Sequence, residues 1–287
     1  MTLKVGRIWV LISAAAFGTM SVLAHRGYAA GLDVPTLMLL RFGLASLALW
    51  AVVLTKREPL PRGKKLGMLL LMGVAIYFAQ SYTYFAAIQH IPAAMVSLLL
   101  YLYPVIVTLF SILLFKEKLT VVRVGALALA LLGTALTIGR VGHGDALGVI
   151  LALVSAGLYS AYILVGSRAA AGVSPLATTA VVTGGTALSY IAYVLLKGAA
   201  PITLAGFGWG AALSIASVVA IGGLLAGLAK ISPVEASVLS ALEPIVTALL
   251  AAIFLGEALG TSQYAGGTLI LAAVVILVRS GQKEPAR

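Results

Sequence analysis

The sequence contains no cysteine and little charge of either sign. With no cysteine among the 287 residues, disulfides, thiolate metal sites and a cysteine nucleophile are all excluded. Only 9% of the residues are charged and 62% are hydrophobic, whereas a soluble domain carries roughly 25% charged residues. A chain with so few charged side chains cannot cover a water-facing surface, so its solvent must be largely membrane lipid.

Motifs of conventional catalysis are also missing. His25, His90 and His143 fall at or near predicted loops and lack metal-ligand spacing. No glycine-rich phosphate loop ends in lysine, which argues against an ATP-driven pump. Of the eight acidic residues, only Glu243 falls deep inside an apolar run, too few for a two-carboxylate active site. We therefore expect no enzyme activity, no metal and no cofactor.

Ten apolar runs cover most of the chain, each near the ~20 residues that cross a bilayer as a helix. They are 8–24, 35–54, 66–89, 93–114, 120–138, 146–166, 174–196, 205–229, 234–254 and 261–278. None shows the period-2 alternation of a membrane β-barrel. We therefore predict an all-α polytopic membrane protein with ten transmembrane helices. The first run resembles a signal peptide, but its partner in the repeat described next indicates a retained span.

The chain repeats itself at a shift of 140 residues. Identical residues at this shift include Pro35 and Pro175, Ile91 and Ile231, Ser97 and Ser237, Leu102 and Leu242, Pro104 and Pro244, Glu117 and Glu257, and Leu119 and Leu259. The shift divides the chain into units over 1–140 and 141–287, with five spans each. An odd number of spans inverts the second unit, and inverted repeats with a site at their junction are a transporter design.

Lysine and arginine are distributed unequally between the two sets of loops. The net charge of +11 would suit a nucleic-acid binder, but these residues lie between apolar runs, so we expect no nucleic-acid partner. Fifteen of the 19 fall on one side, only Arg26, Arg140 and Lys197 on the other, and Arg41 inside a span. The positive-inside rule then places both termini in the cytoplasm of a bacterial-type inner (plasma) membrane.

Two segments at matched positions carry a resemblance to a known family. They are Tyr103-Pro104-Val105-Ile106-Val107 with Phe115-Lys116-Glu117-Lys118-Leu119, and Glu243-Pro244-Ile245-Val246-Thr247 with Leu255-Gly256-Glu257-Ala258-Leu259. With ten spans in two halves, the sequence from about residue 7 to 279 resembles the EamA branch of the drug/metabolite transporter superfamily. The stretch from Pro35 through Arg41-Phe42 also matches the second helix of that family.

The resemblance implies an exporter of amino acids, other metabolites or drugs, and aromatic amino-acid exporters are nearest in character. One departure concerns the first helix of each half, where the family often has a Trp-Gly pair. This chain has Phe17-Gly18 and Leu158-Tyr159 at those places.

Two ionisable side chains fall inside predicted spans. Arg41 lies about six residues into the second span. Glu243 lies nine residues into the ninth, roughly 13 Å deep at 1.5 Å per residue. Each costs on the order of 3 kcal/mol in lipid, so each should face a cavity or a partner. We expect Glu243 to bind a substrate amine or to carry a coupling proton, while Arg41 could be its charge partner or reach the headgroups.

Pro104 and Pro244 each lie near the middle of a predicted span. Because proline has no N–H, the carbonyls of Leu100 and Ser240 lose their helical partners. Water, a side chain or a ligand must then satisfy these carbonyls. The prolines are either static kinks or paired hinges that line a site, and their matched positions favour the second interpretation.

Tyrosines and small polar residues gather near the predicted midplane. A phenol in hydrocarbon needs a hydrogen-bond partner, so these rings either face a polar cavity or pack between helices. The predicted substrate-binding residues are Tyr77, Gln80, Ser81, Tyr84, Ser97, Tyr101, Tyr103, Tyr159, Tyr162, Ser240 and Glu243. Gly223 and Gly227, four residues apart, predict close packing between helices.

Three classes of function remain open. An exporter that works by alternating access is favoured, because an intramembrane enzyme needs clustered catalytic groups and a channel or assembly subunit does not explain inverted halves. The expected substrate is a small zwitterion with an apolar or aromatic side chain, and a lipophilic drug cation is the main alternative. The chain could work as a monomer.

Reporter fusions test the predicted orientation. A periplasm-active reporter fused after Arg279 should be silent, because the positively charged segments are expected in the cytoplasm. The same reporter fused after Lys197, in the opposite set of segments, should be active. Activity after Arg279 would contradict the predicted topology.

Overall fold

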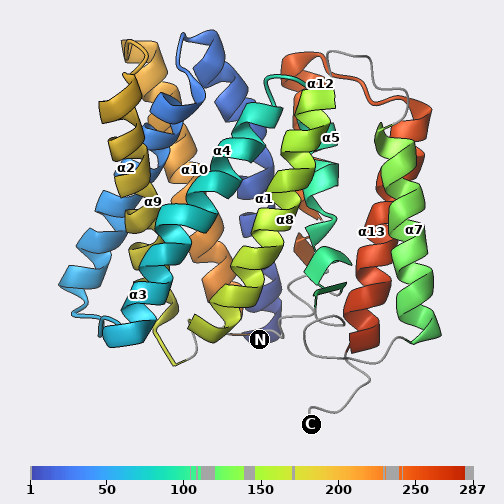
Figure 1. The fold of residues 1–287 in the computed structure, drawn as a ribbon, viewed down its shortest axis with the longest axis horizontal. Coiled ribbons are helices and arrows are strands. Elements are labelled where there is room, and N and C mark those ends of the chain that lie inside the picture. The colour runs from blue at the N-terminus through green and yellow to red at the C-terminus, as the bar shows by residue number, and fades with distance from the viewer. Residues whose placement is uncertain are drawn as a thin grey trace.

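The computed structural model describes residues 2–103, 105–107, 109–110, 120–138, 146–169, 172–228, 230, 239–240 and 242–281. Within these ranges the chain forms helices and no strand (Figure 1). The elements are α1 (Thr2–Ala29), α2 (Val34–Thr55), α3 (Gly63–Leu71), η1 (Met72–Tyr77), α4 (Phe78–Ala87), α5 (Ala93–Leu100), α7 (Val121–Ile138), α8 (Ala146–Ala169), α9 (Pro175–Lys197), α10 (Leu204–Leu228), α12 (Leu242–Leu255) and α13 (Thr261–Gly281).

These elements correspond to the ten predicted spans. Within the described ranges, six helices are long and apolar enough to cross a membrane, judged by length and composition: Lys4–Ala29, Val34–Thr55, Gly63–Ala87, Ala146–Gly166, Pro175–Lys197 and Leu204–Leu224. The shorter apolar helices α5, α7, α12 and α13 lie in the other four spans. The predicted all-α polytopic membrane fold is therefore confirmed.

The fourth predicted span, 93–114, is not one continuous helix. Helix α5 ends at Leu100, a turn follows at Tyr101 and Leu102, and residues 105–107 are helical again. Pro104 itself lies outside the described residues, but its sequence position accounts for the interruption. A proline at 104 has no N–H to donate to the Leu100 carbonyl, so the α-helical hydrogen-bond pattern cannot continue there.

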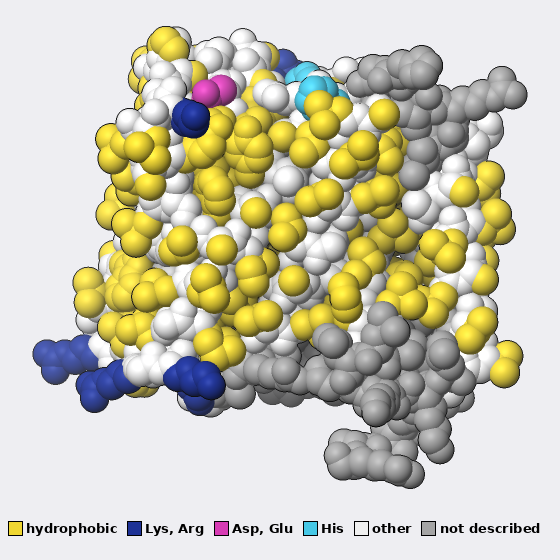
Figure 2. Space-filling model, in the orientation of Figure 1, with side chains coloured by type: hydrophobic (Ala, Val, Ile, Leu, Met, Phe, Trp, Pro, Cys, Tyr) yellow, Lys and Arg dark blue, Asp and Glu magenta, His cyan; other side chains and the backbone are white. Residues whose placement is uncertain are grey.

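The surface has an apolar middle between two polar edges. Leu47, Leu131 and Ile215, each about two-thirds exposed, are typical of the middle. Figure 2 shows hydrophobic side chains across this face, with Lys and Arg along the lower edge and acidic, basic and histidine side chains at the upper edge. Helix α1 starts and helix α13 ends at the lower edge in Figure 1. The band fits a lipid-facing belt with water at both edges.

The two halves pack in the same way. Helix α1 packs on α10 and α12, and its counterpart α8 packs on α4 and α5. Each of α2, α5 and α7 packs on its own counterpart, α9, α12 and α13 respectively. Helix α1 starts at the lower edge of Figure 1, whereas α8 ends there. Exchanging the halves therefore preserves the main helix contacts, as an inverted repeat requires.

Close helix crossings depend on glycine. A Cβ on Gly223 would lie 2.9 Å from the Trp9 carbonyl oxygen, and one on Gly227 would lie 3.1 Å from the Gly6 carbonyl oxygen. The close packing predicted for these two glycines is therefore present, between α10 and α1. Gly133 and Gly266 play the same part between α7 and α13.

The α7–α13 crossing yields a stability prediction. A Cβ on Gly133 would lie 2.7 Å from the Gly266 carbonyl oxygen, whereas a Cβ on Gly125 of the same helix meets nothing within 4 Å. Gly133→Ala should therefore destabilise the protein by about 1–3 kcal/mol through overpacking. Gly125→Ala, the matched control, should be neutral or slightly stabilising because alanine favours helix. Thermal unfolding in detergent compares them, and equal melting temperatures would contradict the prediction.

Candidate functional site

A cavity of about 390 Å³ lies between the two halves. Its walls come from α1, α2, η1, α4, α8, α9, α10 and α12 and from the end of α5 with the turn that follows. All the predicted substrate-binding residues except Ser81 and Ser97 line this cavity. Arg41 lines it as well. Both intramembrane charges thus face the same cavity.

Five tyrosines form a continuous wall of this cavity. This tyrosine wall consists of Tyr101, Tyr103, Tyr159, Tyr162 and Tyr77. Successive ring centroids lie 5.9, 4.8, 5.8 and 5.1 Å apart. Separations of 4.5–7 Å are those of favourable aromatic pairs. The wall therefore combines apolar ring faces with hydroxyl groups, and rings from both halves build it.

At one end of the wall, the Tyr101 hydroxyl lies between two acceptors. It donates to the backbone carbonyl of Ser240 and lies 3.2 Å from Oε2 of Glu243. Pro244, in the first turn of α12, has no N–H to donate to the Ser240 carbonyl. Of the predicted ways to satisfy this carbonyl, the structure uses a side chain, and that side chain comes from the other half. A phenol has one hydrogen, so it can serve the carbonyl or the carboxylate fully, but not both.

The Phe17-Gly18 pair of α1 lies beside this acidic end. Phe17 lines the cavity. A Cβ on Gly18 would lie 2.7 Å from Cβ of Val246 and 3.0 Å from the Glu243 carbonyl oxygen. Glycine at 18 therefore lets α1 and α12 approach closely, which holds Glu243 against the cavity.

Arg41 is not the charge partner of Glu243. Its Nε donates to Oγ of Ser217 at 2.8 Å, and Nη1 and Nη2 contact the sulfurs of Met38 and Met20 at 3.8 and 3.4 Å. Its guanidinium carbon lies over the rings of Phe42 and Phe85. The predicted pairing with Glu243 is wrong because α2 holds Arg41 in this pocket of rings, sulfurs and one hydroxyl.

Ser81 and Ser97 are the predicted binding residues that the cavity excludes. Ser81 is buried against α9, where its hydroxyl lies 2.8 Å from that of Tyr190 and donates to the Phe78 carbonyl. It follows Gln80 by one residue, which turns it about 100° around the helix. Ser97 is fully buried in α5. Neither serine contributes to the cavity wall.

No sequence pattern indicates the π-helical turn η1, which ends at the cavity residue Tyr77. The wide turn is stabilised from the other half. Thr186 donates to the Gly73 carbonyl at 3.0 Å, and Ser189 donates to the Val74 carbonyl at 2.8 Å. Such turns occur often at functional sites, where they re-aim side chains. A π-turn leaves no mark in hydrophobic periodicity, so sequence analysis could not find it.

Sequence analysis also missed most apolar lining residues. They are Phe17, Met20, Phe85, Leu100, Ile163, Val182, Ile221 and Leu224, together with the hydroxyl-bearing Thr179 and Thr183. In a membrane protein an apolar side chain suits lipid, core and cavity equally, so its type does not reveal its position. Only Phe17 had a signal, since it stands at the family's Trp-Gly position.

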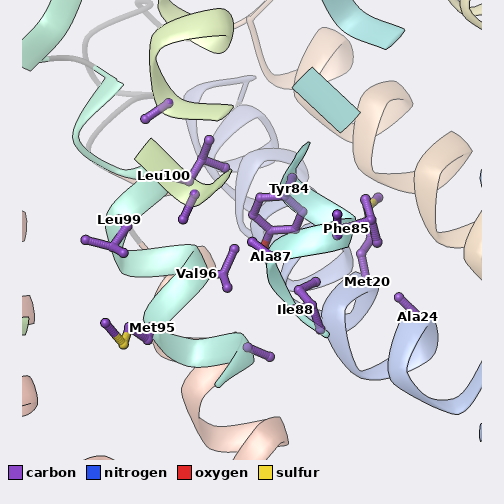
Figure 3. Close-up of a cluster of buried hydrophobic side chains, with 14 of the residues drawn as sticks. Met20, Ala24, Tyr84, Phe85, Ala87, Ile88, Met95, Val96, Leu99 and Leu100 are labelled. Atoms are coloured by element: carbon purple, nitrogen blue, oxygen red, sulfur yellow. The ribbon is translucent and has the colours of Figure 1, made fainter. Parts of the chain in front are cut away.

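The cavity is closed toward the edge opposite the chain termini. Figure 3 shows a cluster of buried side chains in which Met20 and Ala24 of α1 lie near Phe85 and Ile88 of α4, with Val96 of α5 nearby. All are less than 5% exposed. In the other direction the lining continues to Thr179, near the start of α9, and to Leu224, near the end of α10. The cavity thus extends toward the edge that carries the termini.

In the described part of the chain, no group of three or more His, Asp or Glu residues could hold a metal ion. The chemical resources of the cavity are one carboxyl, one guanidinium, hydroxyls and ring faces. This arrangement can bind a small organic molecule that carries both charged and apolar groups.

Comparisons with known proteins agree with this geometry. The model of the EamA-like transporter family matches residues 4–139 and again residues 146–279. An uncharacterized transporter of Archaeoglobus fulgidus is 28% identical over 278 residues, which cover 96% of this chain and 97% of that protein. The uncharacterized transporter YcbK of Bacillus subtilis is 25% identical over 276 residues, 91% and 88% of the two chains. A crystal structure with 19% identity, covering 98% of this chain and 99% of its own, has the same fold with a TM-score of 0.66.

The acidic end yields a prediction for Tyr101→Phe. Removing the hydroxyl leaves the Ser240 carbonyl without its donor, and an unsatisfied buried acceptor costs about 1–3 kcal/mol. Tyr103→Phe is the matched control, because no hydrogen bond from the Tyr103 hydroxyl occurs among the described residues. Detergent unfolding should therefore separate the two variants, with Tyr101→Phe the less stable. Equal stability would show that the Ser240 contact contributes nothing.

Proposed function

This chain belongs to the EamA-like transporter family, and from that premise we propose that it exports a small zwitterion with an apolar or aromatic side chain across the inner membrane. The proposed mechanism is alternating access between the two inverted halves. An aromatic amino acid is the representative substrate. The supporting observation is the cavity between the halves, which is lined by one carboxyl, one guanidinium and a wall of tyrosines.

The cavity suits a small metabolite. Its volume of about 390 Å³ falls at the low end of the ~300–1,000 Å³ typical of small-molecule pockets. Stacked and edge-on tyrosines offer ring faces that add about 0.5–1.5 kcal/mol per aromatic pair beyond area burial. A ring-bearing substrate therefore gains contact energy and still binds loosely enough to leave.

The charges favour a zwitterion over a lipophilic cation. A cation would satisfy Glu243 but would leave Arg41 facing the same cavity without an anion. A molecule with one positive and one negative group matches both side chains. This charge balance is why the amino acid is proposed ahead of the drug cation.

Glu243 offers a route for coupling transport to protons. When the carboxyl is ionised it competes with the Ser240 carbonyl for the single Tyr101 hydrogen, and protonation or a bound ammonium ends that competition. The same carboxyl cannot hold a proton and an ammonium together, so the two would exchange. The ionisable groups around it are Tyr84, Tyr101, Tyr103 and Tyr159, with Arg41 in the same cavity.

The proposed orientation agrees with export. With both termini in the cytoplasm, the cavity extends toward the cytoplasm and is closed on the opposite side by the layer around Met20 and Phe85. An exporter loads its substrate in such a state.

Transport by purified protein in liposomes tests this function. Labelled phenylalanine or tryptophan should enter vesicles that are preloaded with the unlabelled amino acid, and the flux should saturate. Glu243→Gln should lower this flux about 10–100-fold or change its pH profile, because a charge-assisted contact of about 1.5–3 kcal/mol is lost. Glu58→Gln, between α2 and α3, is the matched control and should behave as wild type.

Two results would contradict the proposal. Transport of a hydrophobic cation such as ethidium, with no response to amino acids, would make the protein a drug exporter. A flux that never saturates and shows no exchange would indicate a channel. An unchanged rate and pH profile in Glu243→Gln would remove that carboxyl from the mechanism.

A further inference from the structure

Among the described residues, Arg41 is a buried charge without a counter-ion. Its side chain is only 4% exposed. In the described part of the chain, its five N–H donors have one oxygen acceptor, Oγ of Ser217, while Nη1 and Nη2 have only the sulfurs of Met38 and Met20. Thioether sulfur is a weak acceptor. No carboxylate within the described ranges forms an ion pair with it, so its charge is not neutralised by the protein there.

The surroundings hold the guanidinium in place. Its central carbon lies 4.6 Å from the ring centroid of Phe42 and 4.9 Å from that of Phe85. Ring faces stabilise a cation and fix its plane, but they carry no negative charge. Arg41, Met20 and Phe85 all line the cavity. The terminal nitrogens are therefore fixed beside the cavity, with acceptors that an anion could readily replace.

Three other polar side chains predicted to bind the substrate, Gln80, Ser81 and Ser97, are not available for its carboxylate. Ser81 points to Tyr190, and Ser97 does not line the cavity. Gln80 does line it, but its amide nitrogen already donates to Oγ of Ser155 at 3.1 Å. Arg41 is the only cationic side chain among the described lining residues.

We propose that Arg41 forms an anion subsite that binds the carboxylate of the transported zwitterion. A carboxylate that replaces the Met20 sulfur at Nη2 accepts a charge-assisted hydrogen bond, and a guanidinium can hold it through two parallel bonds. Glu243 then takes the ammonium, and ring faces of the tyrosine wall contact the side chain. Arg41 thus determines that amino acids are selected over the corresponding amines. This subsite rests on the proposed function for its natural ligand.

Three phenyl compounds with different charges test the subsite. Phenylalanine has both groups, phenethylamine lacks the carboxylate, and 3-phenylpropionate lacks the amine. In wild-type proteoliposomes, unlabelled phenylalanine should inhibit the uptake of labelled phenylalanine more strongly than phenethylamine does. In Arg41→Gln, the ratio of the two inhibition constants should fall about tenfold or more, since a lost charge-assisted bond changes affinity by such a factor. Arg26→Gln, whose guanidinium contacts the Phe254 carbonyl at the exposed surface, should keep the wild-type ratio.

Binding without transport gives an independent measurement. In detergent, 3-phenylpropionate should raise the melting temperature of the wild type, whereas uncharged 3-phenylpropanol should not. The increase should disappear in Arg41→Gln and shrink in Arg41→Lys, which keeps the charge but lacks the planar fork. If Arg41→Gln does not fold, Arg41→Lys tests the subsite in its place.

The outcomes separate the subsite from the function. If phenylalanine is transported and the inhibition ratio is the same in Arg41→Gln and wild type, the subsite is wrong and the function stands. If no amino acid is transported but 3-phenylpropionate still stabilises the protein through Arg41, the function is wrong and the subsite stands. If 3-phenylpropionate and 3-phenylpropanol act alike on the wild type, no anion subsite exists at Arg41.

Discussion

The structure depends on one constraint, which is that backbone polar groups in hydrocarbon must find partners inside the protein. Irregular backbone occurs here beside the cavity, and side chains of each half donate hydrogen bonds to the irregular backbone of the other. Tyr101 of the first half donates a hydrogen bond to the Ser240 carbonyl of the second. Thr186 and Ser189 of the second half serve the Gly73 and Val74 carbonyls in η1 of the first. Each half therefore supplies hydrogen-bond donors to the backbone of the other half beside the cavity.

This exchange of hydrogen bonds links the site to the packing of the halves. Away from the cavity, glycines such as Gly133 and Gly266 let backbones touch and fix the crossing of α7 and α13. Around the cavity, tyrosines keep the helices apart. A movement of one half relative to the other must therefore break or remake the contact of Tyr101 with Ser240. Because Glu243 competes for the same hydroxyl, the charge state of the site and the arrangement of the halves are physically connected.

The two intramembrane charges are kept from each other rather than paired. Each is costly in a low-dielectric interior, and direct pairing would lower that cost. Instead Arg41 lies between two phenylalanine rings, and Glu243 lies at the far end of the tyrosine wall. Such unpaired groups fit a binding site whose ligand supplies the missing charges, which is the physical basis of the proposed zwitterion transport.

The sequence alone determined that the chain lies in lipid, that it is helical, that it contains an inverted repeat and that it carries two charges in need of partners. These features could be predicted because span length, composition and lysine placement follow directly from the physics of lipid. It also indicated all five tyrosines of the tyrosine wall, since a buried phenol signals a polar surrounding. Only the tertiary structure decided which groups these side chains contact. A one-residue step turned Ser81 away from the cavity beside Gln80, the π-turn at η1 left no periodic signal, and apolar lining residues such as Phe85 look like any lipid-facing side chain. Above all, the separation of Arg41 from Glu243 depends on how α2 and α12 pack against other helices, which no local pattern records.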